Sequence, residues 1–335
     1  MAALLFQAYM KLRPIPLPPP DTFADQTAVV TGGTSGLGFA AAVHLLRLGA
    51  AEVIISARDA ARGRDAAAQI ASEAAAGGDD KQSLGQVRVI ELDMSRYSSV
   101  AAFAEQVTQV KRGKGGVDVV VLNAGMIGTV YEKGPEGWER NLQTNSLSTA
   151  LLAALLLPYL KSERVSRSSP AHLTLVGSMQ HTSPDINRWH KWASQEDQGS
   201  GGVLKHLNQP ENFISAEDRY AATKLILQYA FEELVKLARK DGGNSPPQVI
   251  MNAVCPGIVK TGLARDYQVR GGLGIRLAVR AFQGLFGKSA ADGARSYLAA
   301  VMTKENQHAQ VWDELCQELG AKVPGFKEIL QSAAN

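Results

Sequence analysis

The sequence predicts an α/β protein, a single domain built on a doubly wound parallel sheet with helices on both faces. Two observations predict this class. Short runs that are apolar on both faces, as in buried parallel strands, alternate with longer helical segments from residue 27 to residue 255, with no break in composition. The first run leads into a glycine-rich turn and then a helix, the unit that opens sheets of this kind.

The glycine-rich turn, Thr31-Gly32-Gly33-Thr34-Ser35-Gly36-Leu37-Gly38, follows the first strand (27–30) and is predicted to bind a phosphate. Small residues let the backbone approach a ligand, and the next helix (39–48) directs its positive end and free N–H groups to the same point. A tight turn without a ligand is the alternative for this motif taken alone. The cofactor contacts expected here are Gly32, Thr34, Ser35, Gly36, Leu37 and Gly38.

The end of the second strand (52–56) is expected to select the cofactor. It continues as Ala57-Arg58-Asp59. A carboxylate at this point would bind the ribose hydroxyls of NAD, whereas a guanidinium suits the 2′-phosphate of NADP. Arg58 therefore favours NADP(H), and Arg62 and Arg64 add positive potential. Asp59 turned inward would favour NAD instead, and Arg58 as a solvated loop charge would favour neither.

A candidate catalytic pair lies on the helix 217–240. Tyr220 and Lys224 share one helix face because they are four residues apart. An ammonium group beside a phenol favours the phenolate, which would lower the pKa of Tyr220 from about 10. A tyrosine tuned in this way can exchange a proton with an alcohol or a developing alkoxide. Ser178, after the fifth strand (172–177), is placed to hydrogen-bond the same substrate oxygen.

With these motifs, residues 25–319 resemble the short-chain dehydrogenase/reductase family. Further matches are Asp93 after the third strand (86–92), Asn123-Ala124-Gly125 after the fourth (118–122), Asn145 in the next helix, and the segment Pro256-Gly257-Ile258-Val259-Lys260-Thr261 after the sixth (248–255). The glycine turn, the end of the second strand and residues 310–319 are similar to the retinol-dehydrogenase-like branch of this family.

The resemblance implies a Rossmann fold, NADP(H) as the hydride carrier, and a role for each matching residue. Tyr220 is then the general acid/base, Lys224 lowers its pKa and contacts the nicotinamide ribose, and Ser178 polarises the substrate carbonyl. Asn145 would hold a water that links Lys224 to solvent; alternatively, Asn145 is a buried polar residue with a structural role. For Asp93, the alternative to a cofactor contact is a role as the N-cap of the next helix. The cofactor contacts implied are Asp93, Met94, Asn123, Ala124, Gly125, Tyr220, Lys224, Pro256, Gly257, Val259 and Thr261.

Two longer segments are expected to form the substrate side. The insert 180–217 begins at a strand end, where active-site loops gather, and carries Trp189 and Trp192. We expect both tryptophans, with Met179 and Leu263, to line the pocket; the alternative is that the tryptophans anchor a surface excursion. The segment 262–288 is apolar with interspersed arginines, and in the family this region is a lid. Such a lid implies a lipophilic ketone or aldehyde: a retinoid-like aldehyde, a steroid, or a polyketide or other biosynthetic intermediate.

The ends of the chain are expected to lie outside the catalytic domain (25–320), as an N-terminal arm with a proline-rich connector (1–24) and a C-terminal tail (321–335). Residues 1–10 are apolar and precede the first basic residue, which is the reverse of a secretory signal. The apolar helix 146–160 is shorter than the roughly 20 residues that cross a bilayer. We expect a cytoplasmic protein, with peripheral membrane attachment through the arm or lid as the alternative. In the family, this helix and the Tyr220 helix often form a homodimer interface.

Charge and cysteine content argue against other classes of protein. The net charge is only +3, without a basic patch interleaved with aromatic residues, which argues against a nucleic-acid partner. The sequence has no Cys/His cluster with the spacing of metal ligands, so no metal site is expected. Cys255, at a buried strand end, argues against a structural disulfide. The predicted function is NADPH-dependent reduction of a lipophilic carbonyl, or oxidation of the corresponding alcohol. The alternatives are a non-redox step on the same fold and a dinucleotide-binding sensor or scaffold.

Overall fold

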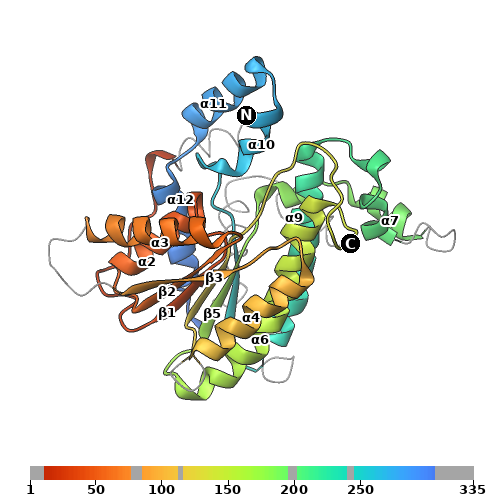
Figure 1. The fold of residues 1–335 in the computed structure, drawn as a ribbon. Coiled ribbons are helices and arrows are strands. Elements are labelled where there is room, and N and C mark those ends of the chain that lie inside the picture. The colour runs from red at the N-terminus through yellow and green to blue at the C-terminus, as the bar shows by residue number, and fades with distance from the viewer. Residues whose placement is uncertain (1–10, 77–84, 112–115, 195–201, 240–244, 306–335) are drawn as a thin grey trace.

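The computed structural model describes residues 11–76, 85–111, 116–194, 202–239 and 245–305 (Figure 1). Its centre is one parallel sheet of six strands in the order β3-β2-β1-β4-β5-β6, which confirms the predicted fold class. The strands are β1 (Thr27–Val30), β2 (Glu52–Ala57), β3 (Gln86–Glu91), β4 (Val119–Leu122), β5 (Ala171–Val176) and β6 (Val249–Val254). The strand order reverses between β1 and β4, and ligands bind at such a point because the connections leave it in opposite directions.

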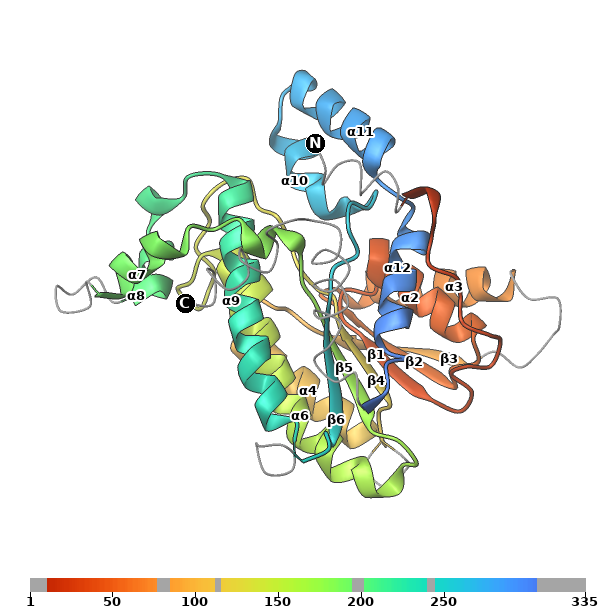
Figure 2. The ribbon, with the colours of Figure 1, turned by 180° about the vertical axis from the view of Figure 1, so that it is seen from behind.

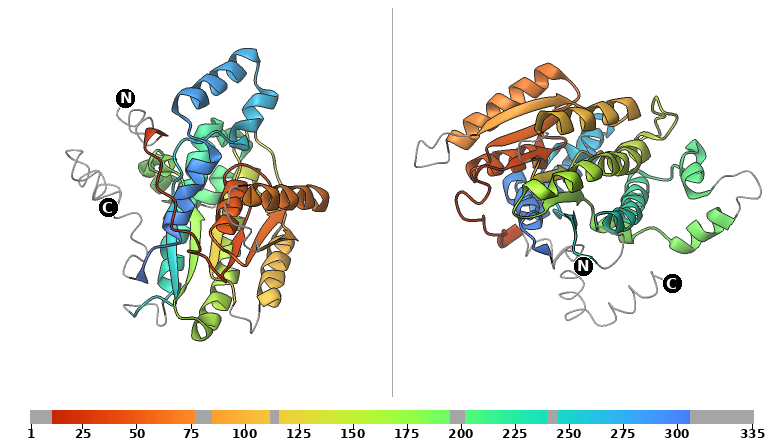
Figure 3. Two further views of the ribbon diagram at one scale, coloured as in Figure 1. Left: turned by 90° about the vertical axis from the view of Figure 1, so that its left-hand side faces the viewer. Right: turned by 90° about the horizontal axis from the view of Figure 1, so that it is seen from below.

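Helices cover both faces of the sheet, as the three layers in Figures 2 and 3 show. One face carries α2 (Gly36–Arg47), α3 (Ala60–Ala75) and α12 (Ala290–Ala300), and the other carries α4 (Tyr97–Lys111), α6 (Ser148–Ser162) and α9 (Ala216–Leu237). Along β1, Ala28 and Val30 pack on the side of α2, and Val29 packs on the side of α6, because successive side chains of a strand point to opposite faces.

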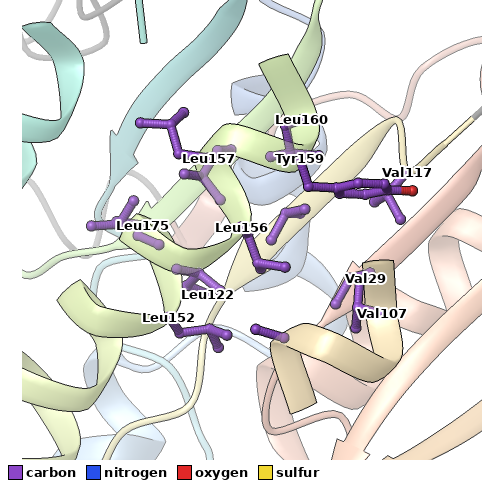
Figure 4. Packing of buried hydrophobic residues seen from close by; sticks show 14 of the residues in the cluster. Val29, Val107, Val117, Leu122, Leu152, Leu156, Leu157, Tyr159, Leu160 and Leu175 are labelled. Carbon is purple, nitrogen blue, oxygen red and sulfur yellow. The ribbon is translucent and has the colours of Figure 1, made fainter. Parts of the chain in front are cut away.

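The hydrophobic core between the sheet and α6 fixes the position of α6 (Figure 4). Leu152, Leu156 and Leu160 recur at every fourth position of α6 and are fully buried against Val29 and Leu122 of the sheet. Burying a leucine side chain contributes roughly 1.5–3 kcal/mol. The position of α6 in turn fixes the turn of π-helix Gln143–Leu147 and the short helix α5 (Arg140–Leu142) that precede it.

The variable segments are mostly helical. The insert contains α7 (Ile186–Ser194) and α8 (Gly202–Leu207), and the lid contains α10 (Arg265–Arg270) and α11 (Leu273–Phe286). Turns of 3₁₀-helix lie at Glu163–Ser166, Met179–Thr182, Pro210–Asn212 and Gly262–Ala264. The expected tail 321–335, the segment 310–319 and residues 1–10 of the arm lie outside the described residues. Within the described ranges, no helix has both the length and the apolar character needed to cross a membrane.

Candidate active site

A cleft of about 820 Å³ opens at the carboxyl edge of the sheet, between the turns that follow the six strands. It is lined by most of the residues that the sequence singles out: Gly32, Thr34, Ser35, Gly36, Leu37, Arg58, Asp93, Met94, Asn123, Ala124, Gly125, Ser178, Tyr220, Lys224, Pro256, Gly257, Val259, Thr261 and Leu263. The structure does not bring Gly38, Asn145, Met179, Trp189 or Trp192 to the cleft wall.

The glycine turn leaves the N-terminus of α2 open to the cleft. Ser35 is the N-cap residue, but its side chain makes no capping hydrogen bond, and the first turn holds no acidic residue. A Cβ at Gly38 would lie 2.5 Å from the carbonyl oxygen of Gly32 and 2.6 Å from Nδ2 of Asn123. Gly38 therefore permits close packing of α2 on the turn, and the free N–H groups of α2 offer a site for an anion.

Asn123 connects this turn to the end of β4. Its Nδ2 donates to the Thr31 carbonyl (2.8 Å), and the Thr31 hydroxyl accepts the N–H groups of Asn123 (2.9 Å) and Ala124 (3.0 Å). The amide oxygen of Asn123 accepts a hydrogen bond from the Tyr297 hydroxyl (2.9 Å), and Tyr297, which is 1% exposed, also lines the cleft. Sequence reasoning missed Tyr297, because nothing in the pattern of α12 distinguishes it from a core tyrosine.

The end of β2 presents unpaired positive charge to the cleft. Arg58 is exposed and lines the cleft together with Arg62, and in the described part of the chain neither guanidinium pairs with a carboxylate. The Asp59 carboxylate accepts the backbone N–H of Arg62 (2.8 Å) and caps α3. This bond uses one oxygen of the carboxylate, and Asp59 also lines the cleft, so its alternative role in binding NAD stays a prediction.

Ser178, Tyr220 and Lys224 meet at one place in the cleft. The Ser178 hydroxyl is hydrogen-bonded to the Tyr220 hydroxyl. The Lys224 ammonium lies 5.6 Å from the centre of the Tyr220 ring and donates to the carbonyl of Val176 (2.7 Å). Thus a hydroxyl from the turn after β5, and a phenol and an ammonium from α9, line the same cleft.

Burial dominates the ionisation of this cluster. It raises the pKa of Tyr220 above its usual value, the thiol of Cys255 adds to this rise, and the hydrogen bond with Ser178 opposes it. Burial also lowers the pKa of Lys224 to about 8. In the protein without a cofactor, the expected lowering of the Tyr220 pKa by Lys224 is therefore wrong. Loss of solvent disfavours the phenolate, and the Lys224 ammonium is directed to the carbonyl of Val176. At neutral pH Tyr220 keeps its proton.

Asn145 is 1% exposed and lies in the π-helical turn behind the cleft. Its side chain accepts the N–H of Met126 (2.8 Å) and donates to the Met126 carbonyl (2.9 Å) and the Thr223 hydroxyl (3.1 Å). The side chain thus joins the turn after β4 to the helix of Tyr220, in line with the structural alternative. A water held by Asn145 stays a prediction.

Asp93 lines the cleft at the end of β3 and stabilises its own turn. Its carboxylate accepts the N–H (3.0 Å) and the hydroxyl (2.8 Å) of Ser95. The N–H of Tyr97, at the start of α4, bonds instead to the Glu136 carboxylate (2.9 Å), so Asp93 does not cap this N–H. Its predicted contact with the cofactor stays a prediction.

The predicted substrate role of Trp189, Trp192 and Met179 is not supported by their positions. Trp189 is 8% exposed and packs in a cluster with Leu207 of α8 and Leu225 of α9. The Trp192 ring stacks on His206, with ring centres 3.8 Å apart. The tryptophans turn away from the cleft because α7 is amphipathic and its apolar face covers α8 and α9, so they anchor the insert. Met179 is half-buried beside Cys255.

Cys255 and the lid complete the other side of the cleft. Cys255 directly follows β6 and lines the cleft, and it is half-buried where the sequence predicted a buried position. The lid helix α10 is fastened across the cleft, because the Asp266 carboxylate accepts the N–H and the hydroxyl of Thr129 (both 2.7 Å) and Arg270 pairs with Glu132. Among the described residues, no group of His, Cys, Asp and Glu side chains could hold a metal ion.

Known proteins share both the sequence pattern and the fold. A family model described as "short chain dehydrogenase" matches residues 26–184. A short-chain dehydrogenase/reductase of Phaeosphaeria nodorum is 33% identical over 304 residues, which cover 91% of this chain and 81% of that protein. A short-chain dehydrogenase from Sphingobium yanoikuyae in complex with NADPH has a TM-score of 0.55 at 19% identity, covering 88% of this chain and 94% of the other. A short-chain dehydrogenase/reductase from Burkholderia phymatum in complex with NAD has a TM-score of 0.56 at 21% identity, covering 83% and 86%.

Proposed function

Since the chain belongs to the short-chain dehydrogenase/reductase family of oxidoreductases, we propose that it is an NADPH-dependent reductase of a lipophilic ketone or aldehyde. The observation that carries the proposal is the cluster of Ser178, Tyr220 and Lys224 in a cleft whose other end has an open helix N-terminus. The motif resemblance to the retinol-dehydrogenase-like branch is consistent with this proposal.

The residues at the nucleotide end fit NADPH better than NADH. The N-terminus of α2 suits the pyrophosphate, and Gly38 leaves the room that its turn requires. Arg58 and Arg62 supply bidentate donors for a 2′-phosphate, while one oxygen of the Asp59 carboxylate caps α3. NADPH, when bound, supplies the hydride. Solved relatives hold either NADPH or NAD, so the two arginines, and not the fold, carry the choice of cofactor.

The catalytic cluster suits proton donation. A Tyr220 hydroxyl with a raised pKa is protonated at neutral pH and can protonate the oxygen of a carbonyl as it is reduced. Ser178 donates a second hydrogen bond to the same oxygen and holds it beside Tyr220. Lys224, with a pKa of about 8, can gain or lose a proton near neutral pH and so return one to Tyr220. These protonation states suit the proton donation that reduction of a carbonyl requires.

The substrate end of the cleft favours an apolar molecule. Met126, Ile127, Val130, Leu263 and Val269 line it. The charged side chains around them bond largely to one another, as Arg270 does with Glu132 and Asp266, and Arg140 with Glu132. Lys133 and Arg265 also line the cleft but are exposed, so the apolar side chains still offer a surface for the substrate.

Arg58→Ala is expected to weaken NADPH binding by about 30- to 100-fold and NADH binding by less than threefold, because only NADPH carries the 2′-phosphate. Calorimetric titration with both dinucleotides measures this. Arg64→Ala is the matched control, since Arg64 lies nearby on α3 but does not line the cleft. Equal losses for the two dinucleotides would reject the assignment. Oxidation of NADPH by lipophilic carbonyls, followed by absorbance, tests the reaction itself.

Tyr297→Phe is expected to raise the Kd for NADPH about three- to tenfold with little change in kcat. The ring stays in place, but the hydrogen bond that orients Asn123 is lost, and such a bond contributes about 1 kcal/mol. Calorimetry and steady-state kinetics separate the two effects. Tyr159→Phe, in the core behind the sheet, is the control. An unchanged Kd would show that Asn123 holds the glycine turn without Tyr297.

A further inference from the structure

The lid helix α11 is amphipathic and directs its apolar face to solvent. None of its residues is buried, and Leu273, Leu277 and Leu285 are 74%, 56% and 68% exposed. At the helical period, apolar side chains occupy more than half of the circumference, and the polar side chains of Arg276, Arg280 and Gln283 occupy the rest. An exposed apolar surface of this kind marks an interaction site.

The α10–α11 arm projects beyond the carboxyl edge of the sheet, and both Figure 1 and Figure 2 show α11 above the layers of helices that cover the sheet, with α10 beside it. Arg276 fixes the angle between the two helices, because its guanidinium donates to the carbonyls of Gly271 (3.0 Å) and Val269 (3.1 Å) at the end of α10. The apolar face is therefore held in a defined orientation away from the protein.

We propose that α11 lies in the interfacial region of an anionic membrane, with its apolar face among the acyl chains and its arginines toward the headgroups. The only charged residues of α11 are Arg276 and Arg280, and the helix contains no acidic residue. A basic polar face opposite a broad apolar face is the pattern of helices that lie in a membrane surface, and anionic lipid attracts the arginines.

A second observation comes from the other end of the chain. The Lys11 ammonium donates to the carbonyls of Gly284 (2.8 Å) and Leu285 (3.0 Å), in the last turn of α11. The sequence before Lys11 (1–10) has no charged side chain and includes Leu4, Leu5 and Phe6. An uncharged, apolar stretch of chain thus joins the protein next to the apolar face of α11, and a membrane is a partner that can accept both.

A second copy of the chain matches this surface less well. Two-fold pairing of α11 through its apolar face would leave Arg276 and Arg280, on the opposite face, without an acidic partner on either helix. Anionic headgroups, in contrast, complement the arginines while the acyl chains cover the leucines.

The position of α10 relates this surface to the cleft. Val269 is 65% exposed and also lines the cleft, so the membrane-facing arm adjoins the cleft mouth. A lipophilic substrate dissolved in the bilayer would then enter without crossing water. This route rests on the proposed function, whereas membrane binding by α11 does not.

Flotation of the full-length protein with vesicles tests the proposal. Binding is expected to be at least about tenfold stronger with vesicles containing about a quarter phosphatidylserine than with phosphatidylcholine alone, and to weaken as salt is added. The double variant Leu277→Glu/Leu285→Glu should lose at least about tenfold in binding. Ile214→Glu/Leu237→Glu is the matched control, because these side chains are 65% and 57% exposed elsewhere on the surface and the added charge is the same.

Three outcomes would overturn the proposal. The first is the absence of vesicle binding, or equal binding to the two lipid compositions. The second is a dimer, seen by sedimentation, that Leu277→Glu/Leu285→Glu dissociates while vesicles bind nothing. The third is vesicle binding that begins only when residues 2–10 are deleted, because the face would then be covered by its own chain. None of these variants should alter the affinity for NADPH, which calorimetry measures. A failure of the membrane proposal can therefore be told apart from a failure of the cofactor proposal.

Discussion

Tyr220→Phe is expected to lower kcat by about 10³-fold while NADPH binding and the free energy of unfolding stay close to those of the parent protein. The substitution removes only the hydroxyl, whose partner is Ser178, and the ring keeps its place on α9 at 8% exposure. General acid catalysis by a positioned side chain contributes about 10²–10⁴-fold, and no other group in the cluster combines a proton with this position. Single-turnover and steady-state assays on one reactive carbonyl measure the loss.

The control for this variant lies on the same helix. Tyr229 is 45% exposed and lies outside the cleft, so Tyr229→Phe should retain the parent kcat. Retention of more than about a tenth of the activity by Tyr220→Phe would remove Tyr220 from the acid role. If NADPH is not oxidised by the parent protein but a product forms from the substrate, a non-redox reaction would be shown instead.

The sheet and most of the cleft could be predicted from the sequence because they depend on local patterns. Most of the strands are apolar runs, and parallel strands place the turns that follow them at one edge, which is why Arg58, Asn123 and Ser178 line the same cleft. The helix through Tyr220 was predicted from its periodicity, and its observed bounds, Ala216–Leu237, differ from the prediction by a few residues at its ends.

The remaining features depend on contacts between distant segments, which no local pattern encodes. Trp189 is anchored by α8 and α9 and does not line the cleft, because its apolar partners come from other elements. Tyr297 reaches Asn123 across a long sequence separation. The direction of the Tyr220 pKa shift follows from how deeply the hydroxyl is buried and from the turn of Lys224 toward Val176, neither of which is visible in the spacing of Tyr220 and Lys224.

Arg219→Met is expected to lower the free energy of unfolding by about 3–5 kcal/mol, the cost of removing one partner of a buried ion pair. Arg219 is 1% exposed, and its guanidinium donates to the carbonyls of Leu207 and Asn212 (3.0 Å for the latter). Its Nε lies 3.9 Å from the carboxylate of Glu139, which is fully buried. The variant leaves two carbonyls without their donor and one carboxylate without its counter-ion. Urea unfolding followed by tryptophan fluorescence measures the loss.

A double variant separates the ion pair from the rest of the site. Glu139→Gln/Arg219→Met removes both charges, so it should be more stable than the sum of the single losses predicts. Arg188→Met, an exposed arginine on α7, is the control and should change stability by less than about 0.5 kcal/mol. A loss below about 1 kcal/mol for Arg219→Met would mean that the insert is held by its tryptophan cluster alone.

Arg219→Met should also lower kcat, since the ion pair between Arg219 and Glu139 joins the two segments that carry the active site. Arg219 directly precedes Tyr220 on α9, and Glu139 accepts the N–H groups of Asn141 (2.9 Å) and Leu142 (3.0 Å), at the start of the turn that leads to Asn145. Displacement of a catalytic group by about 1 Å can cost 10²-fold. Folded Arg219→Met with an unchanged kcat would confine the pair to a stabilising role, whereas a reduced kcat with unaltered NADPH affinity would show that it positions Tyr220.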